Sequence, residues 1–174
     1  MNREMSIERW TVRQIGTRKA VTGTTELKTD LPNKDFITRI RVRLSGLGHA
    51  TQTELTEAAA LSKIKVIGNG SQELFSLSGA QVRAKNVKDN HVKSHALASA
   101  TTTDEVYMDF LIDFGRFYKD RDFILPAKLF DSLQLVLEFD ATNLGYFTTA
   151  SYIDITADVL GYSVVIGYII FKIA

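Results

Sequence analysis

The segment that most constrains the fold is 122–139, which reads DFILPAKLFDSLQLVLEF. After Pro126, successive residues alternate between two faces of the chain. Leu133, Leu135, Leu137 and Phe139 share one face, and Gln134, Val136 and Glu138 share the other. A period of two is typical of a half-buried β-strand. The proline favours a strand entry or an edge position, because proline cannot donate a hydrogen bond to a β-ladder.

The amino-acid composition limits the classes of protein to which this chain can belong. A chain of 174 residues, 45% hydrophobic and 24% charged, suits one globular domain with a sizeable core. The net charge of +1 gives no overall electrostatic attraction to nucleic acid or anionic lipid. The absence of cysteine excludes disulfides, thiolate nucleophiles and thiolate metal sites. We expect no signal peptide, and the longest apolar run, 164–171, is too short to span a bilayer as a helix.

Several short segments share this alternation or end at turn residues. Asn69-Gly70 lies between two of them and predicts a tight hairpin, and Gly161 is expected to separate the last two. The predicted strands are 35–45, 62–67, 72–78, 105–113, 124–129, 132–140, 151–160 and 163–173. Eight short strands without a long helix predict an all-β fold, an eight-stranded antiparallel jelly-roll sandwich of two four-stranded sheets with an N-terminal arm. An immunoglobulin-like sandwich fits less well, because Trp10 is the only tryptophan and precedes these strands.

Two segments lie outside this pattern. We interpret residues 1–33 as an N-terminal arm or edge strand, which either packs on the domain or reaches a neighbouring subunit, and residues 34–174 as a single jelly-roll domain. Residues 79–103 are polar and weakly patterned, and predict a long loop that contacts a neighbour.

A row of arginines marks the first strong strand. Arg39, Arg41 and Arg43 share one face with Ile37, and the opposite face carries Phe36, Thr38, Ile40, Val42 and Leu44. The arginine face is either a solvated, salt-bridged surface or an inter-subunit surface where arginines pair with carboxylates. Phosphate binding is less favoured, because no aromatic residues are interleaved with the arginines.

Groups that carry chemistry are sparse. His91 and His95 have a spacing that suits a metal, but no third ligand accompanies them. Four carboxylates, at 109, 113, 120 and 122, lack calcium-loop spacing, and basic residues at 116, 119 and 121 favour ordinary ion pairs. We therefore expect no enzymatic activity, no cofactor and no metal site.

The order of these segments resembles a family of viral coat proteins. Leu31-Pro32 precedes DFITRIRVRL at 35–44; IKVIGNGS at 64–71 and LFSLSG at 74–79 follow, and Leu125-Pro126-Ala127 precedes 133–139. This order resembles the jelly-roll major capsid proteins of tailless icosahedral phages and archaeal viruses with an internal membrane. The chain length favours the single jelly-roll branch, similar to the small major capsid proteins of Thermus-infecting phages, over the double branch of twice the size.

The resemblance implies a structural subunit that is made in the host cytoplasm and located in the virion. It would assemble into capsomers of an icosahedral shell around an internal membrane and double-stranded DNA. Its implied partners are copies of itself, minor capsid or vertex proteins and the viral membrane, without sequence-specific nucleic-acid binding; a second major capsid protein stays open. The candidate subunit contacts are Arg39, Arg41, Arg43, Arg83, Lys85, Lys88 and Trp10. Reversing the three arginines of the row to glutamate is expected to block assembly of a folded monomer.

Two other jelly-roll functions stay open. A carbohydrate- or receptor-binding module of a virion spike or fibre would use loop aromatics such as Tyr118, Tyr146 and Phe147. A cupin-type enzyme would need histidines on its strands, whereas all three histidines lie in predicted loops.

Overall fold

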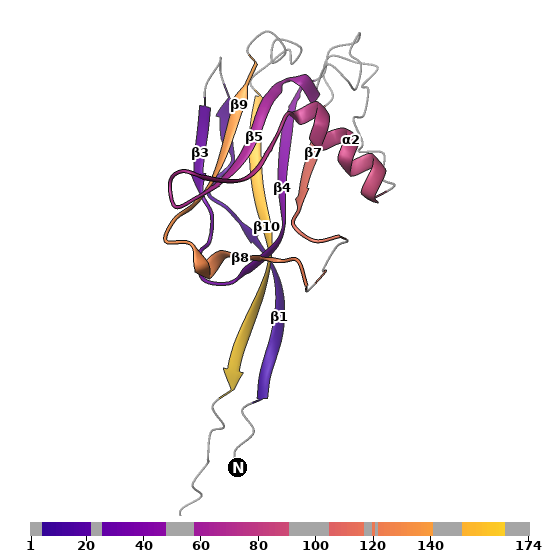
Figure 1. Ribbon diagram of the computed structural model, residues 1–174. Coiled ribbons are helices and arrows are strands. Elements are labelled where there is room, and N and C mark those ends of the chain that lie inside the picture. Colours follow the sequence, from indigo (N-terminus) through magenta and orange to yellow (C-terminus); the bar gives the residue numbers. More distant parts are fainter. Residues whose placement is uncertain are drawn as a thin grey trace, which may run out of the picture.

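The computed structural model describes residues 5–21, 26–47, 58–90, 105–116, 120, 122–140 and 151–165. They form two antiparallel sheets that pack face to face (Figure 1). Sheet A has the order β1 (Met5–Gln14), β10 (Ser151–Val165), β4 (Phe36–Leu47), β7 (Glu105–Asp113). Two short strands extend it, because β2 (Lys19–Val21) pairs with β10 and β8 (Leu125–Pro126) pairs with β4. Sheet B has the order β3 (Glu26–Asp30), β9 (Leu133–Phe139), β5 (Leu61–Gly68), β6 (Gln72–Leu77).

The connectivity is that of a jelly roll. The chain crosses repeatedly between the sheets, so that β5 and β6 are the only ladder partners on the two main strand paths that follow each other in sequence. Two main paths of four strands each agree with the predicted jelly-roll sandwich. The predicted Asn69-Gly70 turn joins β5 to β6, and both residues have the positive φ, 51° and 76°, that a tight hairpin requires.

The predicted strand list is wrong in three places, and one part of it is not tested. Sheet strands β1 and β3 lie in residues 1–33, where one edge strand was expected. Only Leu125–Pro126 of the segment 124–129 is a strand, because the chain then turns through the 3-10 helix η1 (Ala127–Leu129). Gly161 does not end a strand, because it continues β10 opposite Arg9 of β1. Residues 166–173 of the last predicted strand lie outside the described residues.

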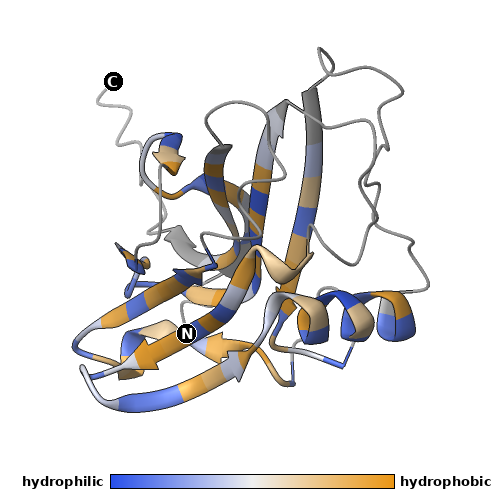
Figure 2. Cartoon of the chain, turned by 90° about the horizontal axis from the view of Figure 1, so that it is seen from above, coloured by the Kyte–Doolittle hydropathy of each residue, from blue (hydrophilic) through white to orange (hydrophobic). Residues whose placement is uncertain are grey.

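The core lies between the two sheets. The core-facing residues predicted for 133–139 are confirmed, since Leu133, Leu135, Leu137 and Phe139 are all buried, but Val136 of the opposite face is buried as well. Figure 2 shows the same alternation of hydrophilic and hydrophobic residues along the strands. Facing β9 across the core are side chains from β4, β7 and β10: Ile40, Val42, Leu44, Met108, Phe110, Ile112, Ile153, Ile155, Ala157 and Val159. Burial of these apolar side chains is the main favourable term in folding.

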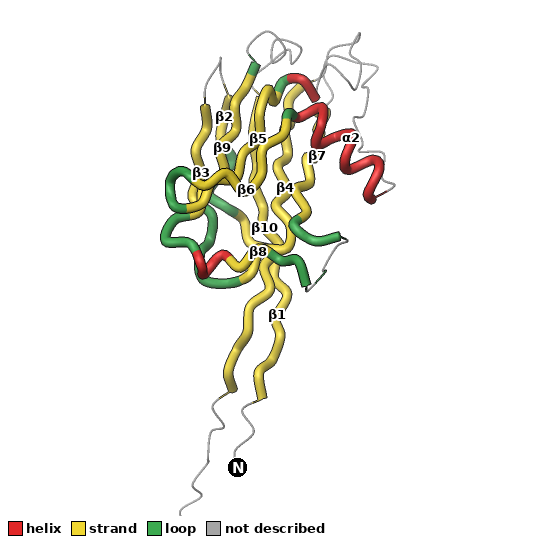
Figure 3. The backbone as a smooth tube through the Cα atoms, viewed as in Figure 1, coloured by secondary structure: helices red, strands yellow, loops and turns green. Residues whose placement is uncertain are grey.

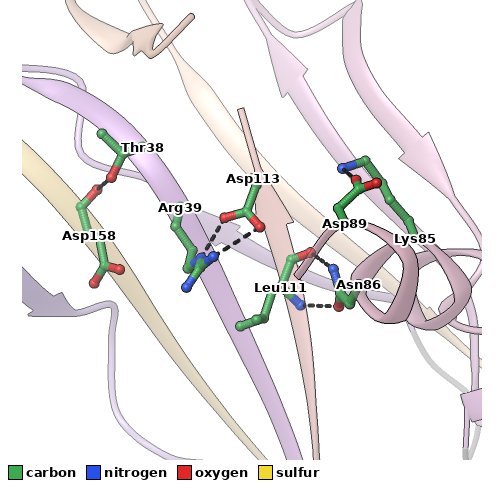
Figure 4. Close-up of polar contacts among 8 residues, drawn as sticks. All are labelled: Thr38, Arg39, Lys85, Asn86, Asp89, Leu111, Asp113 and Asp158. Carbon is green, nitrogen blue, oxygen red and sulfur yellow. Dashed lines mark hydrogen bonds and ion pairs between the residues drawn. The ribbon is translucent and has the colours of Figure 1, made fainter. Parts of the chain in front are cut away.

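A β-bulge changes the predicted faces of β4. The register of β4 with β10 shifts so that Arg39 lies opposite Asp158 and Ile37 lies opposite Val159, which leaves Thr38 as the extra residue. The Thr38 hydroxyl donates to the Asp158 carbonyl oxygen at 3.1 Å (Figure 4). Ile37 therefore turns into the core, although strict alternation placed it with the arginines.

The loop predicted over 79–103 is wrong over its first half. Residues Gly79–Asn90 form helix α2, which lies beside β7 (Figures 1 and 3). Its start is a capping box that sequence reasoning missed: Gln81 N donates to Ser78 Oγ at 3.2 Å, and Ser78 N donates to Gln81 Oε1 at 2.9 Å. Residues 91–103 lie outside the described part of the chain.

Asn86 fastens α2 to the edge of sheet A. Its side-chain amide donates to Leu111 O at 2.7 Å and accepts from Leu111 N at 2.9 Å (Figure 4). The amide thus makes the two bonds that a neighbouring strand would make with β7. A helix that covers an edge in this way blocks pairing with another strand.

β1 and the end of β10 leave the sandwich together as a two-stranded ribbon (Figure 1). β4 pairs with β10 only as far as Leu160, whereas β1 pairs with it as far as Val165. Two strands alone are marginally stable in water. The ribbon suits an arm, and the domain boundary at residue 34 stays a prediction.

We predict that Asn86→Ala lowers the free energy of unfolding by about 1–3 kcal/mol, because two backbone groups of Leu111 lose their partner. Urea denaturation followed by circular dichroism measures the change. Val87→Ala, at an exposed position of the same helix, is the matched control and is expected to be nearly neutral. Equal effects of the two substitutions would contradict the fastening role of Asn86.

Candidate assembly surface

The outer face of sheet A carries three rows of side chains that run across the strands. The central strand, β4, supplies Arg39, Arg41 and Arg43, and each arginine lies between one residue of β10 and one of β7. Directly opposed residues of antiparallel strands point to the same face. The three rows are Asp154–Arg43–Asp109, Thr156–Arg41–Leu111 and Asp158–Arg39–Asp113.

The two outer rows are held by forked ion pairs with β7. Arg39 Nε and Nη2 donate to the two Asp113 oxygens at 2.5 and 3.1 Å (Figure 4), and Arg43 Nε and Nη2 donate to those of Asp109 at 2.7 and 2.8 Å. The Asp113 side chain is only 7% exposed. The hydrogen bonds that Arg43 donates to Asp109 raise the pKa of Arg43, whose guanidinium also lies 4.3 Å from the ring centre of Tyr107. Such two-point contacts orient both side chains.

The central row differs because it contains no carboxylate. Arg41 lies between Thr156 and Leu111, and it makes no ion pair or hydrogen bond within the described part of the chain. It lines an open groove of about 400 Å³ together with Val12, Arg39, Asp109, Leu111, Thr156 and Asp158. Arg41 is therefore the arginine of the row that forms no ion pair within the described residues.

The other predicted contact residues have different surroundings. Arg83 is 7% exposed in the single chain, so its side chain lies beneath the surface. Lys85 donates to Asp89 at 2.7 Å along α2 (Figure 4), whereas Lys88 is exposed in the last turn. Trp10 is half-buried on β1, opposite Leu160. The arginines of β4 share one surface, but the residues of α2 do not belong to it.

The four carboxylates between 109 and 122 form ion pairs, as the sequence indicated, but two of them do so with distant arginines and not with the nearby basic residues. Two of them bind the arginines of β4, and Arg116 binds the other two. Arg116 Nε donates to Asp120 at 2.8 Å, and its Nη2 donates to Asp122 at 2.9 Å. Asp120 also accepts from two backbone N–H groups, and it is almost fully buried. The Arg116 hydrogen bond is the main cause that lowers the pKa of Asp120 to about 2.

The pairing of β4 with β7 had a signal in the sequence that we missed. Asp109 and Asp113 are four residues apart, and so are Arg39 and Arg43. Side chains four apart lie on the same face of a strand, so two adjacent antiparallel strands can match both pairs at once. The structure has this register, with Arg39 opposite Asp113 and Arg43 opposite Asp109.

Several candidate residues lie outside the described residues: His91, His95, Tyr118, Tyr146 and Phe147. Among the residues that the structure describes, no three histidine, aspartate or glutamate side chains form a group that could hold a metal ion. Within the same residues, no helix has the length and apolar character needed to cross a bilayer.

Comparison with solved structures identifies the fold. No family model matches the sequence, and no curated protein matches it either. The solved capsid of the virus PBCV-1 matches 94% of this chain and 44% of that chain, with a TM-score of 0.68 and 11% identity. The atomic structure of Sulfolobus Turreted Icosahedral Virus matches 86% of this chain and 45% of that chain, with a TM-score of 0.66 and 18% identity. This chain has the jelly-roll fold of viral capsid proteins.

A third solved structure matches the same fold. The major capsid protein P2 of bacteriophage PM2 matches 90% of this chain and 51% of that chain, with a TM-score of 0.59 and 11% identity. Across these three comparisons, the chain spans about half the length of the capsid chains that it matches. At identities this low the likeness is one of fold.

We predict that Arg39→Ala costs about 1–3 kcal/mol of folding stability, because it leaves the largely buried Asp113 carboxylate without its forked partner. Arg41→Ala is the matched control on the same strand, and it is expected to change stability by less than about 0.5 kcal/mol. Urea denaturation measures both changes. If Arg41→Ala lowered folding stability as much as Arg39→Ala, the distinction between a structural Arg39 and a dispensable Arg41 would be contradicted.

Asp120 is expected to make the fold sensitive to acid. Its pKa falls from 3.8 to about 2 in the folded chain, so its contribution to stability is complete above pH 3.8 and is lost as the pH falls toward 2. Asp120→Asn should therefore flatten the dependence of stability on pH in this window. Unfolding midpoints measured between pH 5 and about pH 2 test this, and Asp122→Asn, at a mainly exposed carboxylate, is the control that should keep the dependence.

Proposed function

We propose that this chain is a coat subunit of a virus, with a structural and not a catalytic role. The observation that carries the proposal is a jelly roll shared over 86–94% of the chain with capsid proteins of three viruses. A fold alone does not fix a function, since one fold serves many functions. Here the three structures compared are of viral capsid proteins, which supports the coat role over a carbohydrate- or receptor-binding module.

The described residues form one jelly roll, and the chain covers 44%, 45% and 51% of the three matched chains. In the proposed role, copies assemble into capsomers of an icosahedral shell around an internal membrane and double-stranded DNA. A second coat protein, minor or vertex proteins and the membrane are proposed partners that rest on the sequence resemblance.

The physical properties of the sandwich suit this role. A shell needs a stiff subunit with defined sides, and here two sheets close over one apolar core. α2 covers the β7 edge, which restricts strand pairing between copies to other parts of the subunit. Contacts between subunits are then made by the outer faces, the loops and the β1–β10 ribbon.

The structure changes the assembly test that the arginine row suggested. Reversing Arg39 and Arg43 to glutamate would place each new carboxylate beside the aspartate that the arginine now binds. A triple reversal would therefore unfold the subunit as well as disturb its surface. Arg41 is the member of the row on which assembly can be tested apart from folding.

The test of the proposed function is self-association of the purified chain. We expect discrete oligomers that grow with protein concentration, measured by size-exclusion chromatography with light scattering and seen as capsomers or shells by electron microscopy. The measurement is made alone and with lipid vesicles. A chain that stays monomeric over the whole concentration range in both settings would contradict a self-assembling coat subunit.

A further inference from the structure

The ribbon of β1 and β10 has one strand edge without a partner among the described residues. β4 pairs with β10 only as far as Leu160, whereas β1 continues along the other side of β10 to Val165. Within the described part of the chain, the segment 161–165, which reads GYSVV, therefore has a partner strand on one side only. Such an edge presents unpaired backbone groups to any strand that comes beside it.

The hydrogen bonds of β10 indicate which residues face this edge. Ile155 O accepts from the backbone N–H of Ile15, the residue that follows β1, at 2.8 Å. In an antiparallel pair, residues alternate between those that bond to the partner strand and those whose backbone groups point away from it. The register of β1 with β10 has no shift, so odd residues of β10 bond to β1. The backbone groups of Tyr162 and Val164 therefore point to the free edge.

β6 is a second edge of the same kind. It is the last strand of sheet B, and among the described residues it pairs only with β5. Its sequence, QELFSL, contains one charged residue, Glu73, and its apolar side chains pack against the core. At the rise of an antiparallel strand, β6 is about 20 Å long and the segment 161–165 is about 17 Å long. The two edges therefore match in length.

The other sheet edges carry features that oppose strand pairing. Asn86 of α2 already bonds to the edge of β7. β2 and β8 are short, with three and two residues. The outer strands β3 and β1 each contain three charged residues: Glu26, Lys28 and Asp30 in β3, and Glu8, Arg9 and Arg13 in β1. Short strands, charged residues and covering helices are the usual protection of an edge.

The two unprotected edges lie apart within one subunit. The ribbon projects from the sandwich beyond Leu160, whereas β6 lies within sheet B (Figure 1). Two strands alone are marginally stable, so the ribbon gains stability when another strand pairs with it. A second copy can bring its own β6 beside the ribbon, and both edges are then covered by one contact.

We propose that residues 161–165 of β10 add as a fifth strand to the β6 edge of sheet B in a second copy of this chain. The backbone groups of Tyr162 and Val164 make the new ladder, because main-chain hydrogen bonds supply the affinity of strand addition. The inference rests on the proposed coat function and specifies one of its subunit contacts. Because the donor strand and the acceptor edge are different patches, the contact is heterologous, and it forms a closed ring when the rotation between copies closes.

A pair of proline variants tests the donor edge. Val164→Pro removes an outward N–H and keeps the bonds from β10 to β1, so self-association should weaken about tenfold or more. Ser6→Pro is the matched control, because Ser6 lies opposite Val164 and its backbone groups point to the other edge of the ribbon. It should leave association unchanged. Concentration-dependent light scattering gives the association constants, and thermal unfolding confirms that both variants are folded.

Cross-linking tests the acceptor edge. The chain has no cysteine, so Ser163→Cys in one preparation and Ser76→Cys in another provide the only thiols. Mixed and treated with a short bismaleimide, the two preparations should form a covalent heterodimer. The control pair is Ser163→Cys with Lys28→Cys, which lies on β3 at the opposite edge of sheet B and should not cross-link.

The outcomes separate this inference from the proposed function. If the wild type associates but Val164→Pro has no effect, or Ser6→Pro weakens association as much, the β10 edge is not the donor. If Ser163→Cys cross-links to itself and gives no heterodimer with Ser76→Cys, the ribbons pair with each other and the β6 acceptor is wrong. The coat function stands in these cases. A wild type that never associates overturns the coat function and the contact with it.

Discussion

Two apolar sheet faces can be removed from water only by closing over each other, and this constraint determines most of the molecule. Phe110 of β7 and Leu135 of β9 lie in different sheets, and both are completely buried in one cluster. Once the inner faces are used in this way, the polar half of each alternating strand must lie outside. The arginines of β4 therefore reach the outer face through the same periodicity that fills the core.

The outer face of sheet A is organised by strand register and not by charge alone. Arg39 and Arg43 meet aspartates because β7 pairs with β4 at one position; a shift by one residue would turn those aspartates into the core. The forked pairs thus favour the native register as well as contributing to stability. Arg41 lies in the same strand but in a row without a carboxylate, which separates its role from that of its neighbours.

Elements that depend on neighbours in the sequence could be predicted, and elements that depend on strands far away in the chain mostly could not. The core-facing residues of β9 and the Asn69-Gly70 hairpin follow local patterns, and both are confirmed. β1 and β3 are strands because β10 and β9 lie beside them, and their own polar sequences carry a weak signal. The Thr38 bulge likewise depends on the pairing with β10. α2 is a different case, since Ser78 and Gln81 gave a local capping signal that the polar composition of the segment concealed.

The candidate surface likewise combines a local signal in the sequence with long-range pairing that the sequence does not show. The arginine row was visible in the sequence, but the partners of Arg39 and Arg43 are far away in the chain, and the register shows that Arg41 lies in a row without a carboxylate. For a single jelly roll in the proposed role, that difference has a further consequence. Two jelly rolls joined in one chain meet at a high effective concentration, whereas separate copies must be held by affinity alone. Complementary charges between copies exclude wrong orientations, because a misplaced copy would bring like charges together.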